Sequence, residues 1–166
     1  MWTAAACVLA LAHASVSAQE APCRGCTPDS TRTKTHVFPA LGLRAGVPQK
    51  ASVGIGVVFG VDWRHGGTDY SRDVAFCLEP GIGATRASVA YITGVGNIGS
   101  GFGVAATAMR TSARPWTFAG NNTYLGGEVL IWPVFLAGPR VGLFRRVSGD
   151  ATMKRWYLSA DFGFGL

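Results

Sequence analysis

One glycine-rich segment has the spacing of a phosphate-binding motif. Residues 94–99 read Gly-Val-Gly-Asn-Ile-Gly, which matches the pattern GxGxxG. In a dinucleotide-binding site this pattern opens a helix whose N-terminus holds the pyrophosphate. Here residues 100–103 continue with the alternation of a strand. We therefore interpret the segment as a glycine-rich turn between two strands, and we expect no bound cofactor.

The polar segment around His65 is a second place where chemistry could occur. Asp62, His65 and Asp69 could ligate a metal, and Ser71 lies near enough in sequence to suggest a hydrolase. The three ligands follow no established metal-binding spacing. A nucleophile and its base must also meet on one side of an element, whereas successive strand residues point to opposite faces. We expect a solvated loop, no metal site and no enzymatic activity.

Cysteine is sparse in the chain. Cys23 and Cys26 form a CxxC pair, and Cys77 stands alone inside a strand-like segment. A redox-active CxxC would be expected beside a βαβ unit, and no such pattern follows. We interpret Cys23 and Cys26 as a possible local disulfide of an exported protein.

The N-terminal residues have the pattern of a secretory signal. Residues 4–12 are apolar, and small residues follow up to Ala18, after which we expect cleavage. The pattern departs from the usual one because no Lys or Arg precedes the apolar segment. We predict a signal peptide at 1–18, a flexible polar tail at 19–35, and a β-barrel domain at 36–166.

Composition narrows the class of protein. Charged residues make up 14% of the 166 residues, against about 25% in a typical soluble domain. Apolar residues make up 48%, which is too many for a disordered chain. No run of about 18 apolar residues occurs beyond the first twenty positions, so we expect no transmembrane helix there. The net charge is +6, but no basic stripe is interleaved with aromatics, so we expect no nucleic acid partner.

The main structural signal is a period of two. Along residues 51–63, one face carries Ala, Val, Ile, Phe and Trp, and the other carries three Gly residues with Ser52, Val58 and Asp62. Successive strand side chains point to opposite faces, so one face is an apolar row. A glycine-rich face suits the interior of a narrow barrel, and the apolar row would then contact lipid.

The same alternation recurs along the chain, and several segments approach the 9–11 residues of a tilted membrane strand. It predicts an all-β fold, a closed antiparallel up-and-down β-barrel of about eight strands. Aromatic residues near strand ends are placed as membrane-interface girdles would be. The predicted strands are 37–46, 51–63, 73–83, 87–93, 102–109, 125–132, 141–146 and 156–166. The girdle candidates are Trp63, Tyr70, Trp116, Tyr124, Trp132 and Trp156.

Six charged residues fall on the inward phase of these strands. A charge in a narrow interior needs a partner, because desolvation is otherwise costly. We interpret the set as a structural network of ion pairs that fills the barrel; a selectivity or ligand site is the alternative. The six residues are Arg44, Glu79, Glu128, Arg140, Arg146 and Asp161.

The final strand resembles the terminal strand of bacterial outer-membrane β-barrels. Residues 156–166 alternate aromatic and apolar side chains up to the last residue, which is Leu166 rather than the usual aromatic. The resemblance implies the outer membrane as location, with membrane lipid and the barrel-assembly machinery as partners. We expect a non-catalytic barrel with a structural or surface-interaction role, whose ligand the sequence does not identify. The alternatives are a secreted, lipocalin-like barrel that binds a small apolar ligand, and a lipid-modifying membrane enzyme.

Overall fold

The computed structural model describes residues 33–65, 67–95, 100–112, 120–133, 137–150 and 155–165. The chain divides into two units, residues 1–30 and 31–166, and all the described residues belong to the second. The predicted signal peptide and the CxxC pair lie outside the described residues, as does the predicted tail up to residue 32.

Period-two alternation gives eight strands within the described ranges. The first begins at Lys34, two residues before the predicted domain start at 36. The alternating segments extend by a few residues at most ends, because backbone pairing continues past the last apolar side chain. The strands are β1 (Lys34–Val47), β2 (Ala51–His65), β3 (Thr68–Pro80), β4 (Ala84–Val95), β5 (Ser100–Thr111), β6 (Thr123–Trp132), β7 (Ala137–Ser148) and β8 (Trp156–Gly165).

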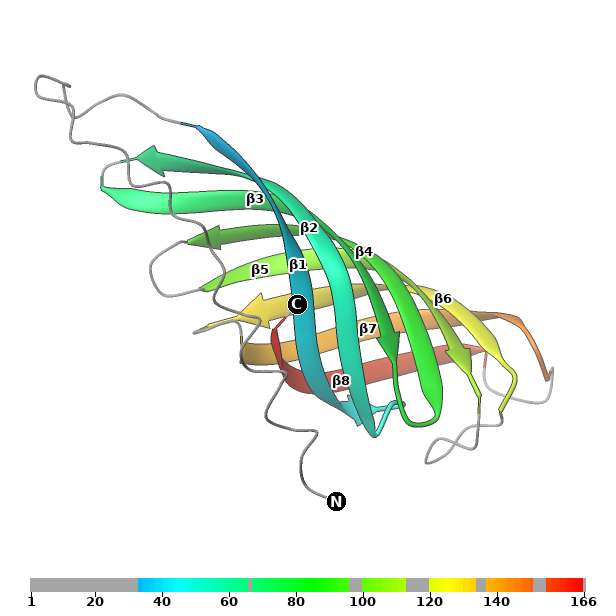
Figure 1. The fold of residues 1–166 in the computed structure, drawn as a ribbon. Helices are drawn as coiled ribbons and strands as arrows, with labels where there is room; N and C mark the ends of the chain where they lie inside the picture. The colour runs from blue at the N-terminus through cyan, green and yellow to red at the C-terminus, as the bar shows by residue number, and fades with distance from the viewer. Residues whose placement is uncertain are drawn as a thin grey trace, which may run out of the picture. The chain divides into compact units, whose positions relative to one another are not determined.

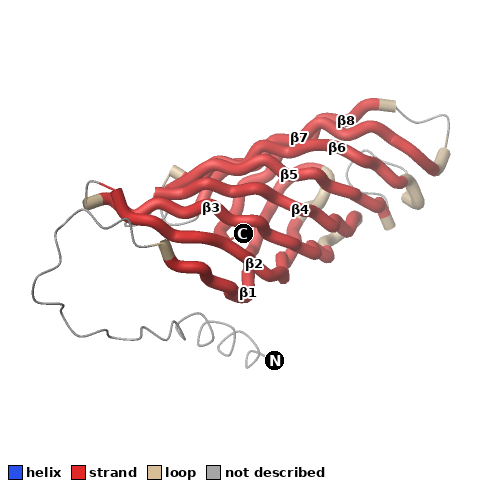
Figure 2. Tube along the Cα trace, turned by 90° about the horizontal axis from the view of Figure 1, so that it is seen from above, coloured by secondary structure: helices blue, strands red, loops and turns tan. Residues whose placement is uncertain are grey.

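The strands form a closed ring, which we call the strand ring. Each strand pairs antiparallel with the next, and β1 pairs with β8 to complete the circuit (Figure 1). Strands account for most of the described residues (Figure 2). The predicted all-β class, with about eight antiparallel strands in up-and-down order, is confirmed.

The register shows that the strands are staggered. A path through paired residues starts at His36 of β1, crosses all eight strands and returns to β1 at Gly46, ten positions further on (36 to 46). In closed sheets such a stagger goes with strands tilted by roughly 40° to the axis. Residues far apart in sequence therefore share one level of the strand ring.

The strand ring has two ends. The terminal end is where β1 begins and β8 ends, and it also carries the connections between β2 and β3, β4 and β5, and β6 and β7. The loop end carries the turns after β1 and β3 and the longer connections 112–122 and 149–155.

Burial separates the two faces of the sheet. Outward side chains are exposed and largely apolar in every strand; Val53 and Ile55 of β2, for example, are about half exposed, at 50% and 49%. Inward side chains are buried, such as Ser52 and Val58 of the same strand. The predicted separation of residues 51–63 into two faces is confirmed.

The interior is layered along the axis. Toward the terminal end lies an apolar cluster, and toward the loop end lies a mostly aromatic cluster. Charged side chains occupy the level between them. The apolar cluster is Ala40, Val58, Ala75, Ala90, Ile92, Ala105, Leu130 and Trp132. The aromatic cluster is Ala84, Met109, Tyr124, Phe144 and Tyr157.

Candidate functional site

Three arginines and three carboxylates meet inside the strand ring at the middle level. Each is less than a tenth exposed, and each comes from a different strand. The three positive and three negative formal charges cancel. We call this group the charge network: Arg44 (β1), Arg86 (β4), Arg140 (β7), Glu79 (β3), Glu128 (β6) and Asp161 (β8).

Arg140 makes the closest pairing in the charge network. Its Nη1 and Nη2 donate to the two oxygens of Glu79 at 2.5 and 2.7 Å. Its Nε donates to Asp161 at 3.0 Å and lies 3.6 Å from Glu128 Oε1. One guanidinium thus joins β7 to β3, β8 and β6. Its pairing with Glu79 has the two-pronged geometry that planar guanidinium and carboxylate groups favour.

Asp161 is the point at which the arginines converge. It accepts hydrogen bonds from Arg86 at 2.7 Å and from Arg44 at 3.3 Å, as well as from Arg140. Glu128 accepts from Arg86 at 3.1 Å and from the Thr107 hydroxyl at 2.6 Å. Each of the three carboxylates therefore accepts at least two hydrogen bonds, and both of those to Glu79 come from Arg140.

The closure of this network limits what it can do chemically. Asp161 contacts three arginines, Glu128 two and Glu79 one, so each carboxylate is already paired with at least one cation. Some donors remain open: Arg86 Nε and Nη2 and Arg44 Nε have no hydrogen-bond partner among the described residues. The guanidinium carbon of Arg86 lies 5.8 Å from the centre of the Phe144 ring, which covers part of that charge.

Five of the six predicted interior charges come together in the charge network, and Arg146 does not. Arg146 has the inward phase on β7, but it lies at the loop end, where it donates to the backbone oxygen of Asp150. Arg86 was missed, because the predicted strand began at residue 87 whereas β4 begins at Ala84. Arg86 lies two positions before Ser88 and therefore on the same face of the strand, and this was the signal in the sequence that could have identified it.

The girdle prediction is wrong for Tyr124 and Trp132. Both point inward and are at most 2% exposed. Trp132 fills space left by small inward residues; a Cβ added to Gly103, for example, would lie 3.5 Å from its ring. Trp63 and Tyr70 do stack on the outer face, with ring centres 5.6 Å apart, and Trp156 is 56% exposed. Trp116 lies outside the described residues.

A second polar cluster occurs on β1–β3 at the terminal end. His36 Nδ1 lies 3.0 Å from Asp62 Oδ2, and His36 Nε2 lies 2.9 Å from Asp73 Oδ1. Ser71 donates to the other oxygen of Asp73 at 3.0 Å. The Asp73 carboxylate thus stands between the hydroxyl and the imidazole, so this is not the arrangement of a base that activates a nucleophile. Sequence reasoning missed His36 because its partners lie on other strands.

The remaining candidates from the sequence are the segment around His65, the GxGxxG segment and Cys77. Asp69, proposed beside His65 as a ligand, forms an exposed ion pair with Arg64 at 3.0 Å. No group of three or more His, Cys, Asp or Glu side chains in the described ranges is arranged to hold a metal ion. The GxGxxG segment joins β4 to β5, whose end residues Val95 and Ser100 are paired. Cys77 is a half-buried free thiol on β3.

Within the described part of the chain, no helix is long and apolar enough to cross a membrane. The chain matches no known protein family, no characterised protein and no solved structure.

Proposed function

We propose that the chain is an integral membrane β-barrel of the bacterial outer-membrane type, with a structural or surface-interaction role and no catalytic one. The observation that carries the proposal is the inverted distribution of polarity. Six ionisable side chains lie inside the strand ring, while large apolar side chains of every strand lie exposed on its outer face. Soluble monomers rarely expose so continuous an apolar surface.

The dimensions of the apolar surface support the proposal. The outward row of β1 runs from Val37 to Val47, a span of eleven positions in which no outward side chain is charged; Arg44 points inward. A tilted strand needs about 9–11 residues to cross the hydrocarbon core. On the outer face at the terminal end, Arg72 lies 4.9 Å from the Trp63 ring, which stacks on Tyr70. Such aromatic and cationic groups are typical of membrane interfaces.

The interior supports a filled barrel rather than a ligand carrier. A lipocalin-like protein needs an apolar cavity that can hold its ligand. An interior void of about 10 Å³ borders Cys77, Glu79 and Arg140. That is room for about one water molecule. The inside of the strand ring is occupied by its own side chains.

We further propose export to the outer membrane after cleavage of the signal peptide, and assembly through recognition of β8 by the barrel-assembly machinery. Outer-membrane barrels have short periplasmic turns and longer external loops. By that rule the terminal end faces the periplasm and the loop end faces outward.

Fractionation of cells that express the full chain tests this proposal. We expect the protein in the outer-membrane pellet, extracted only with detergent and migrating differently on gels before and after boiling. Recovery of a folded protein from the soluble periplasmic fraction would contradict it and would favour the secreted soluble alternative.

A further inference from the structure

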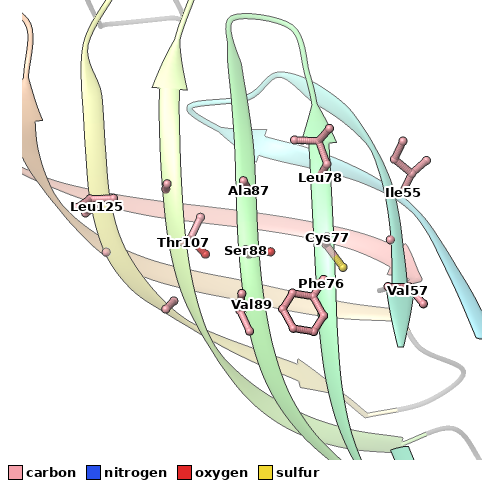
Figure 3. Close-up of a pocket in the computed structure, with 14 residues that line it drawn as sticks. Ile55, Val57, Phe76, Cys77, Leu78, Ala87, Ser88, Val89, Thr107 and Leu125 are labelled. Atoms are coloured by element: carbon pink, nitrogen blue, oxygen red, sulfur yellow. The ribbon is translucent and has the colours of Figure 1, made fainter. Parts of the chain in front are cut away.

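The outer wall of the strand ring is hollowed across β2–β6. The hollow lies where three outward positions carry alanine rather than a larger side chain: Ala87 of β4, and Ala106 and Ala108 of β5. Larger side chains border it, with Leu125 on one side and Leu78 and Ile55 on the other (Figure 3). An apolar groove therefore lies on the surface that the proposed function places in lipid.

A cation lies at the loop end of this groove. Arg110 follows Ala108 by two positions on β5, so it points outward from the same face, and it is exposed. The register places Thr85 of β4 directly opposite it on one side and Thr123 of β6 on the other. Directly opposed residues have Cβ atoms about 5 Å apart, so the two threonines flank the base of the Arg110 side chain.

The outward arginines of the described strands face no outward acidic side chain on those strands. The outward charged side chains of the described strands include Arg72, Arg110 and Arg145, whereas the acidic side chains of those strands all have the inward phase. Arg110 therefore has no outward carboxylate on the neighbouring strands. An exposed arginine beside two hydroxyls suits a phosphate, which accepts several charge-assisted hydrogen bonds at once.

We propose that this groove binds one phosphate-bearing membrane lipid, with its phosphate on Arg110, Thr85 and Thr123. One acyl chain lies along Ala108 and Ala106 beside Leu125, directed toward the middle of the membrane. The geometry is consistent with a lipid, because the cation stands at the membrane edge and the apolar groove descends from it. The inference rests on the proposed membrane location and specifies a lipid partner within it.

Short-chain lipids added to the folded protein in non-ionic detergent test the proposal, with bound lipid counted by native mass spectrometry. Three probes separate the contributions: dioctanoyl phosphatidic acid, dioctanoylglycerol and inorganic phosphate. We expect one tightly bound phosphatidic acid, and much weaker binding of dioctanoylglycerol, which has no phosphate. Inorganic phosphate bound as tightly as the lipid would overturn the proposal, because the site would then be an anion site without an acyl chain.

Variants locate the site. Arg110→Gln should weaken phosphatidic acid binding at least tenfold, which corresponds to loss of a charge-assisted contact. Ala106→Leu fills the groove and should weaken binding while Arg110 is kept. Arg72→Gln is the matched control, since it removes an outward arginine at the opposite end and should leave binding unchanged. Equal weakening by Arg72→Gln, or unchanged binding in Arg110→Gln or Ala106→Leu, would overturn the site.

The folded state of each variant is checked by its gel migration before and after boiling. All three positions lie on the outer face, away from the charge network, so folding should survive the changes. If the protein folds into detergent and lipid vesicles but binds phosphatidic acid identically in all variants, the lipid site fails and the membrane proposal stands. A chain that folds in water without detergent would instead reject the membrane proposal itself.

Discussion

Arg140 of β7 donates hydrogen bonds of 2.5 and 2.7 Å to the two carboxylate oxygens of Glu79 on β3, across the inside of the strand ring. The two residues are 61 positions apart in sequence, and their strands are not neighbours in the sheet. The pair therefore ties together parts of the wall that backbone hydrogen bonds do not join. Its loss should affect stability rather than any reaction.

Glu79→Ala should lower the free energy of unfolding by about 3–5 kcal/mol, because it leaves the buried charge of Arg140 uncompensated. Urea unfolding in lipid vesicles, followed by tryptophan fluorescence, measures the change. Asp69→Ala is the control, because the Asp69–Arg64 pair is exposed and should contribute no more than about 1 kcal/mol. Similar losses in the two variants would contradict the structural role of the charge network.

Replacing both Glu79 and Arg140 should lower the free energy of unfolding by less than the sum of the two single substitutions. The double variant Glu79→Leu with Arg140→Met removes both charges of the pair, so neither is left buried without the other. Asp161 and Glu128 each lose one contact with Arg140. We expect a coupling free energy of about 1–3 kcal/mol from the double-mutant cycle. Strict additivity of the two single changes would show that the pair does not act as a unit.

An arginine in the middle of the outer wall should be costly if that wall contacts lipid. Val104 of β5 is 48% exposed and points outward between Phe102 and Ala106. Val104→Arg should destabilise the protein by about 2–4 kcal/mol in vesicles. Thr68→Arg, at the terminal end, should cost little. Equal yields of folded protein for the two variants in vesicles would argue against a membrane-embedded wall.

Alanine substitution at two adjacent glycines of β6, Gly126 and Gly127, should change the stability of the protein in different ways. A Cβ on inward Gly126 would lie 2.2 Å from the Leu143 carbonyl oxygen and 2.7 Å from the Phe144 ring, so the backbone must shift. On outward Gly127 the nearest atom would be the Ala105 oxygen, at 3.7 Å, an ordinary contact. We expect Gly126→Ala to destabilise by about 1–3 kcal/mol. Gly127→Ala should be neutral or slightly stabilising by about 0.5–1 kcal/mol in the same unfolding experiment.

The purified wild-type protein should show no steady ion conductance in a planar bilayer. The charge network spans the interior, and the aromatic cluster, including Tyr124 and Phe144, lies above it toward the loop end. Single-channel recording at symmetric salt checks this. Stable, discrete conductance steps would contradict the filled interior and would make the same carboxylates candidates for a selectivity filter.

The sequence alone was sufficient to predict the all-β class, the approximate strand count and the outward face of each clear strand. Side-chain direction in a strand alternates with period two, and that property is local. In β2 and β5 every second residue is apolar over a long run, so the face assignment needed no knowledge of the partners. Five of the interior charges were found for the same reason, because Glu79 and Asp161, for example, lie in long alternating segments.

Only the tertiary structure decided which of those charges meet. Arg44 and Asp161 are 117 positions apart, and they touch because a stagger of ten positions brings their strands to one level. Arg146 has the same inward phase as Arg140, but it lies beyond that level and contacts Asp150 instead. Arg86 joins because β4 begins earlier than its apolar pattern suggests. Alternation determines the face on which a side chain lies, whereas its height along the axis depends on the register between strands, which is a property of the closed ring as a whole.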